Sequence, residues 1–291
     1  MTEFERKFEK AEEFFNEKKY LHAVQIYQSL LNIEQIKRKA AVKLIEIYDI
    51  QHQFESAVNV FKRYLSDEES DEDMLTYYAQ FLIRYKKYAE AHDVLSAISN
   101  DNRPEKNLLM GIVNYYLEDY EIALINFADF IKRNPNSELL PEAHLFTANC
   151  YLKNMELDST LNHAKESEKI YNQNYEVYLI LAVVYFSKEM YYHALDNIQK
   201  SIKLNPGDIK SILWSGRILN KMGEPEQAKK ILNHAISKID EDTELLNLLG
   251  MIYFELGDVN NAIKNFMKVL RINPSDGEAK EGLLLCNSIK N

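Results

Sequence analysis

An alanine that returns about every 34 residues is the feature that most restricts how this chain can fold. A spacing of this length is typical of arrays in which one supersecondary unit is repeated and each copy contacts only its neighbours. The intervals between successive markers are 34, 34, 32, 37, 34, 34 and 34 residues. Threonine replaces alanine once, and the eight markers are Ala23, Ala57, Ala91, Ala123, Thr160, Ala194, Ala228 and Ala262. The sequence therefore predicts eight copies of one unit.

Other positions recur in step with the marker. Twelve residues before it the chain carries a small or apolar residue, such as Gly250, and four residues after it usually an aromatic or branched one. Two helices can approach closely where both carry small residues, and a bulky side chain then fills the space beside them. Three copies carry an Asn-Pro pair with its proline twelve residues after the marker. Because proline lacks an amide donor, it ends a helix there. Each copy is therefore predicted to be a pair of helices.

The pattern resembles the tetratricopeptide repeat. Leucine replaces the usual tryptophan in the last copy, whose signature places hold Leu246, Leu249, Gly250, Tyr253, Ala262, Phe266 and Pro274. The resemblance extends from residue 4 to residue 276, in copies that begin at Phe4, Arg38, Glu72, Pro104, Pro141, Tyr175, Ile209 and Thr243. It implies an all-α, right-handed superhelical solenoid of antiparallel helix hairpins. Arrays of this kind end in a capping helix, and residues 277–291 are predicted to form it.

The fifth copy departs from the pattern. Thr160 stands where alanine is expected and Ala164 where an aromatic residue is expected, so a larger side chain faces a smaller one. Three additional residues, Glu138–Leu140, precede this copy. We expect a seam at residues 138–141, where the superhelical twist changes within a single solenoid of residues 1–291.

Acidic side chains are in excess along the chain, whose formal net charge is -10. Nucleic acid binding depends on Lys and Arg side chains that neutralise phosphates, so no nucleic acid partner is expected. Six acids are concentrated in the seven residues Asp67–Asp73. We expect this run to form a solvated loop whose last acids favour the start of a helix.

The chain contains no long apolar segment. Its longest apolar run, Val177–Phe186, is about half as long as a membrane span requires. The first fifteen residues alternate charged residues with Phe and contain no apolar core of a signal peptide. The two cysteines, Cys150 and Cys286, are too few for a disulfide framework. We therefore expect a cytoplasmic protein without membrane insertion.

No pattern typical of catalysis or of cofactor binding occurs. The sequence contains no Gly-rich phosphate loop, no His-Glu-x-x-His pair and no Cys-x-x-Cys. The seven histidines are interpreted as surface or packing residues, at most one in each hairpin, and not as metal ligands. The sequence thus predicts a protein that is not an enzyme and binds neither a cofactor nor a metal.

Function is expected on the face of the first helices that points away from the hairpin stack. If places 4, 7, 8 and 11 of each first helix face the core, a rotation of about 100° per residue puts places 2, 5, 6, 9, 12 and 13 on the other side. The resemblance implies that these places line a concave, ligand-binding groove. Copies four, five, six and eight carry mostly apolar residues there. The predicted partner-binding residues of these copies are Leu108, Ile112, Tyr115, Tyr116, Leu145, Phe146, Asn149, Leu179, Val183, Phe186, Met251 and Phe254.

One stretch of this face is basic. Lys210, Trp214, Arg217 and Lys221 occupy places 2, 6, 9 and 13 of the seventh copy. Trp and Arg are enriched among the residues that dominate binding energy, and Arg offers a planar fork for a carboxylate. These four residues are predicted to bind acidic side chains of the partner. The alternative is that Trp214 packs between copies while the basic side chains remain in water.

The chain is therefore predicted to be a scaffold for protein–protein interaction, or an assembly factor, that binds an apolar, partly acidic segment of a partner protein. Three alternatives stay open. Neighbouring first helices of a tightly curled superhelix can cover the apolar residues. The same residues can instead form a homodimer, which would make the protein a structural, self-associating solenoid. A regulatory subunit of an enzyme complex would carry the same sequence features.

Overall fold

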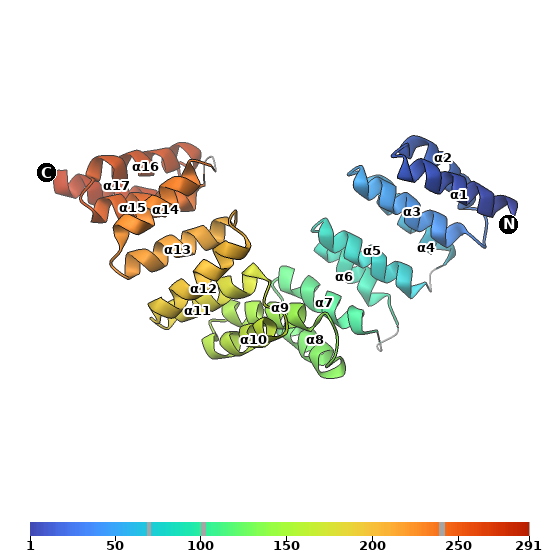
Figure 1. Cartoon of the computed structure of the whole chain (residues 1–291), viewed down its shortest axis with the longest axis horizontal. Helices are drawn as coiled ribbons and strands as arrows, with labels where there is room; N and C mark the ends of the chain where they lie inside the picture. Colours follow the sequence, from blue (N-terminus) through green and yellow to red (C-terminus); the bar gives the residue numbers. More distant parts are fainter. Residues whose placement is uncertain (69–70, 100–102, 239–241, 291) are drawn as a thin grey trace. The chain divides into compact units, whose positions relative to one another are not determined.

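The structure, a computed structural model, describes residues 1–68, 71–99, 103–238 and 242–290. All regular elements in these ranges are α-helices, so the predicted all-α fold is confirmed (Figure 1). The first helices of the hairpins are α1 (Glu3–Asn16), α3 (Lys37–Ile50), α5 (Glu72–Arg84), α7 (Pro104–Tyr116), α9 (Leu140–Lys153), α11 (Tyr175–Ser187), α13 (Ile209–Lys221) and α15 (Thr243–Glu255). The remaining helices are α2 (Tyr20–Leu30), α4 (Phe54–Asp67), α6 (Tyr88–Ser96), α8 (Tyr120–Arg133), α10 (Leu157–Ile170), α12 (Tyr191–Leu204), α14 (Pro225–Ile236), α16 (Val259–Ile272) and α17 (Gly277–Lys290).

A residue in the left-handed backbone region stands between the two helices of each repeat. Eight residues have φ between 55° and 80°. The amide of the residue after each of them donates to the carbonyl oxygen five residues earlier, at N–O distances of 2.8 to 2.9 Å. This hydrogen bond typically closes the end of a helix when the next residue is left-handed. The left-handed residues occupy the fifteenth place of the copies and are Lys18, His52, Lys86, Glu118, Met155, Glu189, Gly223 and Gly257.

The recurring alanines lie in the core. All seven, together with Thr160, are fully buried. Of the bulky residues four places later, Tyr27, Phe61 and Phe266 are also fully buried. Thr160 donates its hydroxyl to the backbone oxygen of Glu156 at 2.9 Å, so its buried oxygen atom has a partner. The positions that make the repeat visible in the sequence are therefore those that bury the helices against one another.

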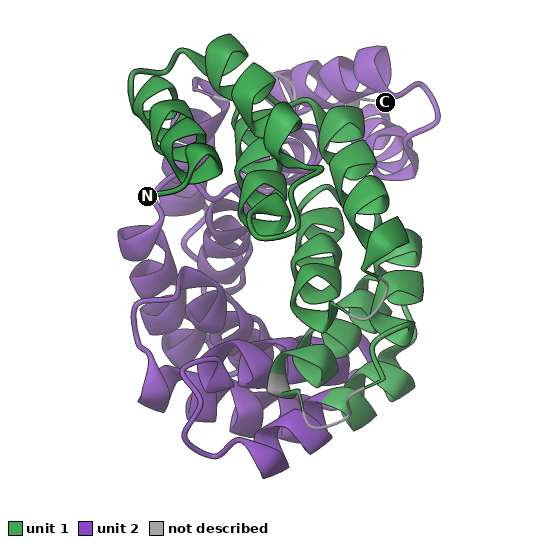
Figure 2. Ribbon diagram, turned by 90° about the vertical axis from the view of Figure 1, so that its right-hand side faces the viewer, with its two compact units in different colours: residues 1–126 green, residues 127–291 purple. Residues whose placement is uncertain are grey.

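The chain forms two compact units, residues 1–126 and residues 127–291 (Figure 2). In the first unit, the hairpins α1–α2, α3–α4 and α5–α6 pack in order, and α7 packs on α5 and α6. In the second unit, the hairpins α9–α10, α11–α12, α13–α14 and α15–α16 pack in order, and α17 packs on the last of them. The boundary between the units falls within α8, upstream of the seam predicted at residues 138–141.

The acidic run Asp67–Asp73 does more than form the solvated loop expected from its sequence. Asp71 accepts a hydrogen bond from Nε of Arg38 at 2.9 Å, and Asp73 lies 2.6 Å from Nη1 of Arg103. These ion pairs connect the start of α5 with the starts of α3 and α7. Because the paired side chains are at least partly exposed, each pair contributes only about 0.2–1 kcal/mol. Asp71 also accepts the amide of the third residue of α5, as expected for an acid that favours a helix start. Residues 69 and 70 of the run lie outside the described residues.

The helix α17 contacts α15 and α16, and its buried residues are Ala279, Gly282 and Cys286. A Cβ atom added at Gly282 would lie 2.4 Å from the ring of Phe266. Glycine therefore lets α17 lie directly on this ring, which a larger residue would prevent. That residues 277–291 act as a cap stays a prediction, and residue 291 lies outside the described residues.

Candidate partner-binding face

The first helices of the second unit lie next to one another in chain order. α9 contacts α11, α11 contacts α13, α13 contacts α15, and α15 contacts α17 (Figure 1). Residues at equal places of successive first helices are therefore neighbours. We call the residues at places 2, 6, 9, 12 and 13 of α9, α11, α13 and α15 the first-helix face.

Three of the residues predicted to bind a partner are buried. Leu108 and Leu145, at place 5 of α7 and α9, are 2% and 4% exposed. In these two helices place 5 lies about one helical turn before core place 8, and both side chains belong to the buried stripe, whereas Leu179 at the same place of α11 is half-buried. Ile112, one turn after Leu108 on α7, is also buried, at 5% exposure. The prediction that these three side chains contact a partner is wrong for this structure, in which they form part of the core.

The other residues predicted on α9, α11 and α15 are half-buried. They are Phe146, Asn149, Leu179, Val183, Phe186, Met251 and Phe254. In the first unit, Tyr115 is half-buried, and Tyr116 is 46% exposed and stacks on Tyr88 with ring centroids 4.4 Å apart. Neighbouring helices thus cover the apolar face in part, and an accessible apolar strip remains on the second unit.

Trp214 connects two successive repeats of the second unit. Its ring meets the ring of Phe186 edge to face, with centroids 5.3 Å apart and planes at 72°. The guanidinium carbon of Arg217 lies 5.1 Å from the centroid of the Trp214 ring, within the range of a cation–π contact. Trp214 is half-buried. Trp214 therefore packs between repeats, as the alternative interpretation expects, and still presents part of its ring. That this residue contacts a partner stays a prediction.

The basic side chains around Trp214 are accessible. Lys210 and Lys221 are exposed and have no ion-pair partner among the described residues. Arg217 is paired with Glu244 of α15 at an N–O distance of 3.9 Å. Because both members of this pair are substantially exposed, it is worth only about 0–1 kcal/mol. A carboxylate of a partner can therefore replace Glu244 at little cost.

Two histidines contact each other in the fifth hairpin. His144 belongs to α9 and His163 to α10, so the expectation of at most one histidine in each hairpin is wrong. Their Nδ1 atoms are 2.9 Å apart, and the ring of Tyr151 stacks on His163 with centroids 5.6 Å apart. Burial lowers the pKa of both imidazoles, and His144 lowers the pKa of His163 further. A spacing of nineteen residues between two helices carries no recognisable motif, so only the packing of the hairpin brings this pair together.

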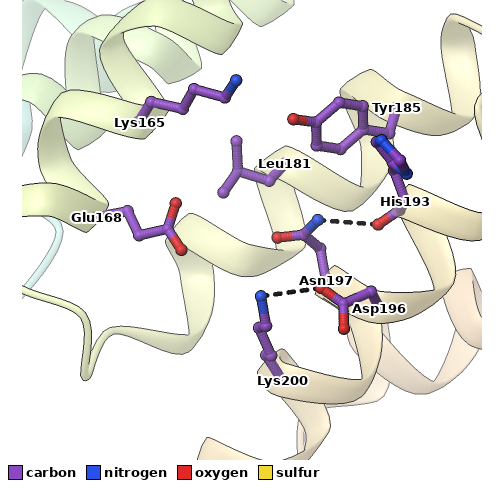
Figure 3. Close-up of a pocket in the computed structure, with 8 residues that line it drawn as sticks. All are labelled: Lys165, Glu168, Leu181, Tyr185, His193, Asp196, Asn197 and Lys200. Atoms are coloured by element: carbon purple, nitrogen blue, oxygen red, sulfur yellow. Dashed lines mark hydrogen bonds and ion pairs between the residues drawn. The ribbon is translucent and has the colours of Figure 1, made fainter.

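A pocket of about 440 Å³ lies between α10, α11 and α12 (Figure 3). Its charged side chains are Lys165 and Glu168 from α10 and Asp196 and Lys200 from α12. Asp196 and Lys200 form an ion pair at 2.8 Å. Positive and negative charges are equal in number in this pocket and partly neutralise each other. The arrangement therefore favours no ligand of a particular charge.

The cysteines and the possible metal ligands of the described residues do not come together in a common site. Cys150 and Cys286 are buried, and burial raises the pKa of Cys150 to about 12. A thiol of this kind stays protonated and is a poor nucleophile. Within the part of the chain that the structure describes, no group of three or more His, Cys, Asp or Glu residues could hold a metal ion. In the same residues, no helix has the length and apolar character that crossing a membrane demands.

The stacked hairpins and the shared face of their first helices define an α-solenoid repeat protein. The family model of the tetratricopeptide repeat matches residues 175–208, 209–237 and 243–276, which contain α11 to α16. The chain therefore carries tetratricopeptide repeats between residues 175 and 276, which confirms the resemblance seen in its sequence. A second model, that of subunit 3 of the anaphase-promoting complex, cyclosome, matches residues 50–130.

Several curated proteins are similar to parts of the chain. The BBSome complex member BBS4 of Bos taurus is 28% identical over 114 residues, which are 39% of this chain and 22% of that protein. The BBS4 homologue of Drosophila melanogaster is 22% identical over 205 residues, 69% of this chain and 41% of that protein. The human protein O-mannosyl-transferase TMTC1 is 28% identical over 101 residues, 35% of this chain and 12% of that protein. The chain thus spans less than half the length of each of these relatives.

Solved structures share the fold over most of the chain. Similarity to a chain of the APC/C hetero-tetramer Cut9–Hcn1 has a TM-score of 0.70 at 12% identity and covers 91% of this chain and 52% of the other. Similarity to a tetratricopeptide-repeat protein of Parabacteroides merdae has a TM-score of 0.65 at 17% identity and covers 85% and 98% of the two chains. At these identities the likeness concerns the fold alone.

Proposed function

We propose that the chain is a non-enzymatic scaffold or assembly factor that binds an apolar, partly acidic segment of a partner protein on its first-helix face. The observation that carries this proposal is the contact group of Phe186, Trp214 and Arg217. Accessible Trp and Arg side chains in a packed setting are the residues that most often dominate the energy of protein–protein binding. The half-buried apolar residues of α11 and α15 suit apolar side chains of the partner, and Lys210 and Lys221 suit its carboxylates.

The comparisons support the coarser part of this proposal. Tetratricopeptide-repeat proteins are interaction scaffolds, and BBS4 carries the name of a complex member. The second family model likewise describes a subunit of a large complex. A chain that resembles subunits of multi-protein assemblies is suited to holding other proteins together. The match to TMTC1 covers only 12% of that protein and gives little support for a transferase.

The test compares four forms of the full chain in crosslinking capture from the source cells. They are the wild type, Trp214→Ala, Arg217→Glu and Lys169→Glu, the last of which makes the same charge change at an exposed position of α10. We expect the wild type and Lys169→Glu to capture the same partner and the other two variants to lose it. For the recovered partner, Trp214→Ala should weaken binding by on the order of 2 kcal/mol, about thirtyfold. Added salt should weaken wild-type binding because it screens the charges.

Two further measurements show whether a loss of binding comes from the substituted surface itself. Melting temperatures of the variants should stay near that of the wild type, because neither substitution changes a fully buried residue. Trp214 is the only tryptophan of the chain, so its fluorescence reports on this position alone. If both variants retain normal affinity and the emission maximum does not change at saturating partner, the first-helix face around Trp214 is not the binding site.

A further inference from the structure

A second hollow of the second unit lies between the second helices α12 and α14. Its volume is about 780 Å³, within the range of roughly 300–1,000 Å³ that is typical of ligand sites. The C-terminal end of α12, the start of α13 and one side of α14 form its walls. We call it the α12–α14 groove.

The α12–α14 groove is distinct from the first-helix face. Both sites use α13, but the groove uses Ile212 and the face uses Trp214. Two residues correspond to a rotation of about 200° around a helix, so these side chains point to opposite sides of α13. A ligand in the groove therefore leaves the surface around Trp214 accessible.

The floor of the groove is apolar. Ile202, Ile212 and Ile231 line it from three different helices, and all three are only half-buried. Gly207 and Ala235 also line it, and these small residues take up little of its space. Half-buried branched side chains from three helices form a surface on which further apolar side chains can be buried, which is favourable at about 25 cal/mol per Å² of apolar area.

The rim of the groove is basic. It is lined by Lys230 and His234 of α14 and by Lys238, which follows the end of this helix. None of the described lining residues carries a carboxylate. No ion-pair partner of these three side chains occurs among the described residues. This excess of positive charge stands out in a chain whose net charge is -10.

The positive charge continues on the other side of α14. A neighbouring hollow of about 560 Å³ between α14 and α16 is lined by Lys264, Lys268 and Arg271, again without a carboxylate among its described residues. An extended segment that leaves the α12–α14 groove across α14 would therefore meet further cations.

We propose that the α12–α14 groove is a second docking site, which binds an acidic peptide segment of a partner protein. Two or three apolar side chains of the peptide lie on Ile202, Ile212 and Ile231, and its carboxylates lie beside Lys230 and Lys238. Charge complementarity selects this occupant, because a basic or neutral segment would leave the lysines without partners. A nucleic acid suits the groove less well, since the imidazole of His234 is the only aromatic ring in its described lining on which a base could stack.

The test uses the immobilised full chain and a random dodecapeptide display library. Selection on the wild type is followed by removal of peptides that also bind Ile231→Glu. We expect the enriched peptides to combine apolar residues with Asp or Glu. Synthetic copies should bind Ile231→Glu and Lys230→Glu on the order of tenfold more weakly than the wild type, a loss typical of central interface residues. They should bind Trp214→Ala and the control Lys203→Glu, an exposed charge change on α12 outside the groove, as tightly as the wild type.

Several outcomes would overturn the proposal. One is the enrichment of no peptide, or of basic peptides only. Another is peptide binding that depends on Trp214 but not on Lys230, which would support the first-helix face instead. Because Ile231→Glu could disturb folding, the exposed Lys230→Glu variant decides the result where their melting temperatures differ. If light scattering shows a dimer that Lys230→Glu dissociates, the groove holds a second copy of the chain and not a partner peptide.

Discussion

Six of the eight repeats place a residue with a side chain in the left-handed backbone region of the turn between their helices. A Cβ atom in this region crowds the following carbonyl group and costs about 1–2 kcal/mol, a cost that glycine avoids. Gly223 and Gly257 avoid it in the seventh and eighth repeats. The turns of the first six repeats therefore contain backbone strain that a glycine substitution would remove.

Met155→Gly should stabilise the chain by about 1 kcal/mol. Met155 has φ of 60° and a side chain that is 70% exposed, so glycine relieves strain there without removing buried contacts. The matched control is Asn154→Gly at the preceding exposed residue, whose φ is −84° and where glycine only adds freedom to the unfolded chain. Urea unfolding followed by circular dichroism measures both. A Met155→Gly midpoint at or below that of the control would contradict the strain assigned to this turn.

The contact between His144 and His163 should make stability depend on pH. Burial lowers the pKa of both in the folded chain, and Glu166 opposes this shift only in part. In the unfolded chain a histidine titrates near pH 6.5, so the unfolded state binds more protons than the folded state just below that pH. The stabilising effect of the neutral pair is therefore complete above about pH 6.5 and declines as the pH falls toward the lower pKa values of the folded state.

Melting curves between pH 8 and pH 5 measure this decline. The double variant His144→Leu/His163→Leu should show a smaller loss of melting temperature over this range than the wild type, because it has no neutral pair to protonate. The variant His193→Gln, which removes an exposed histidine, should behave like the wild type. Equal slopes for the wild type and the double variant would show that the pair does not control acid sensitivity.

At the scale of helices, the packing of α17 on Phe266 depends on the absence of a side chain at residue 282. An alanine Cβ there would lie 2.4 Å from the Phe266 ring, so Gly282→Ala must displace the ring or the helix. Overpacking of this kind costs about 1–3 kcal/mol. Gly277→Ala on the same helix is the control, since its Cβ would meet nothing within 4 Å.

Thermal unfolding of the full chain separates the two variants. We expect Gly282→Ala to melt at a lower temperature than the wild type and Gly277→Ala at the same or a slightly higher one. Deletion of residues 277–291 should lower the melting temperature further, because Phe266 then loses its cover. If the deletion leaves melting temperature and solubility unchanged, α17 does not cap the array.

At the scale of the whole molecule, the described helices of each unit pack on their neighbours in the sequence, so stability can differ along the array. The fifth repeat combines Thr160 with Ala164 and contains the polar contact of two histidines. We therefore expect local opening to be easier there than in the seventh and eighth repeats. Hydrogen exchange measured on peptides should show faster exchange at residues 135–170 than at residues 209–276. Uniform protection of both segments would exclude a seam.

Local sequence rules predict the repeat itself. Ala23 and its equivalents, Gly250 and the Asn-Pro pairs act through backbone geometry and close helix contact, which depend on residue type and spacing alone. The positions of the helices and the all-α fold could therefore be derived from the chain before its structure. The basic stripe with Trp214 on α13 was visible for the same reason, since helical periodicity places its residues on one side.

Tertiary packing decided the rest, because it depends on which neighbour reaches a side chain. Leu108 and Leu145 were expected on the accessible side of their helices but are covered by the stack. Two histidines nineteen residues apart meet only because α9 and α10 pack as a hairpin. The α12–α14 groove likewise arises from residues of three helices and from Gly207 in the loop between α12 and α13. The sequence by itself determined the repeated hairpin and one stripe of its accessible face, and burial between hairpins determined which side chains a partner can reach.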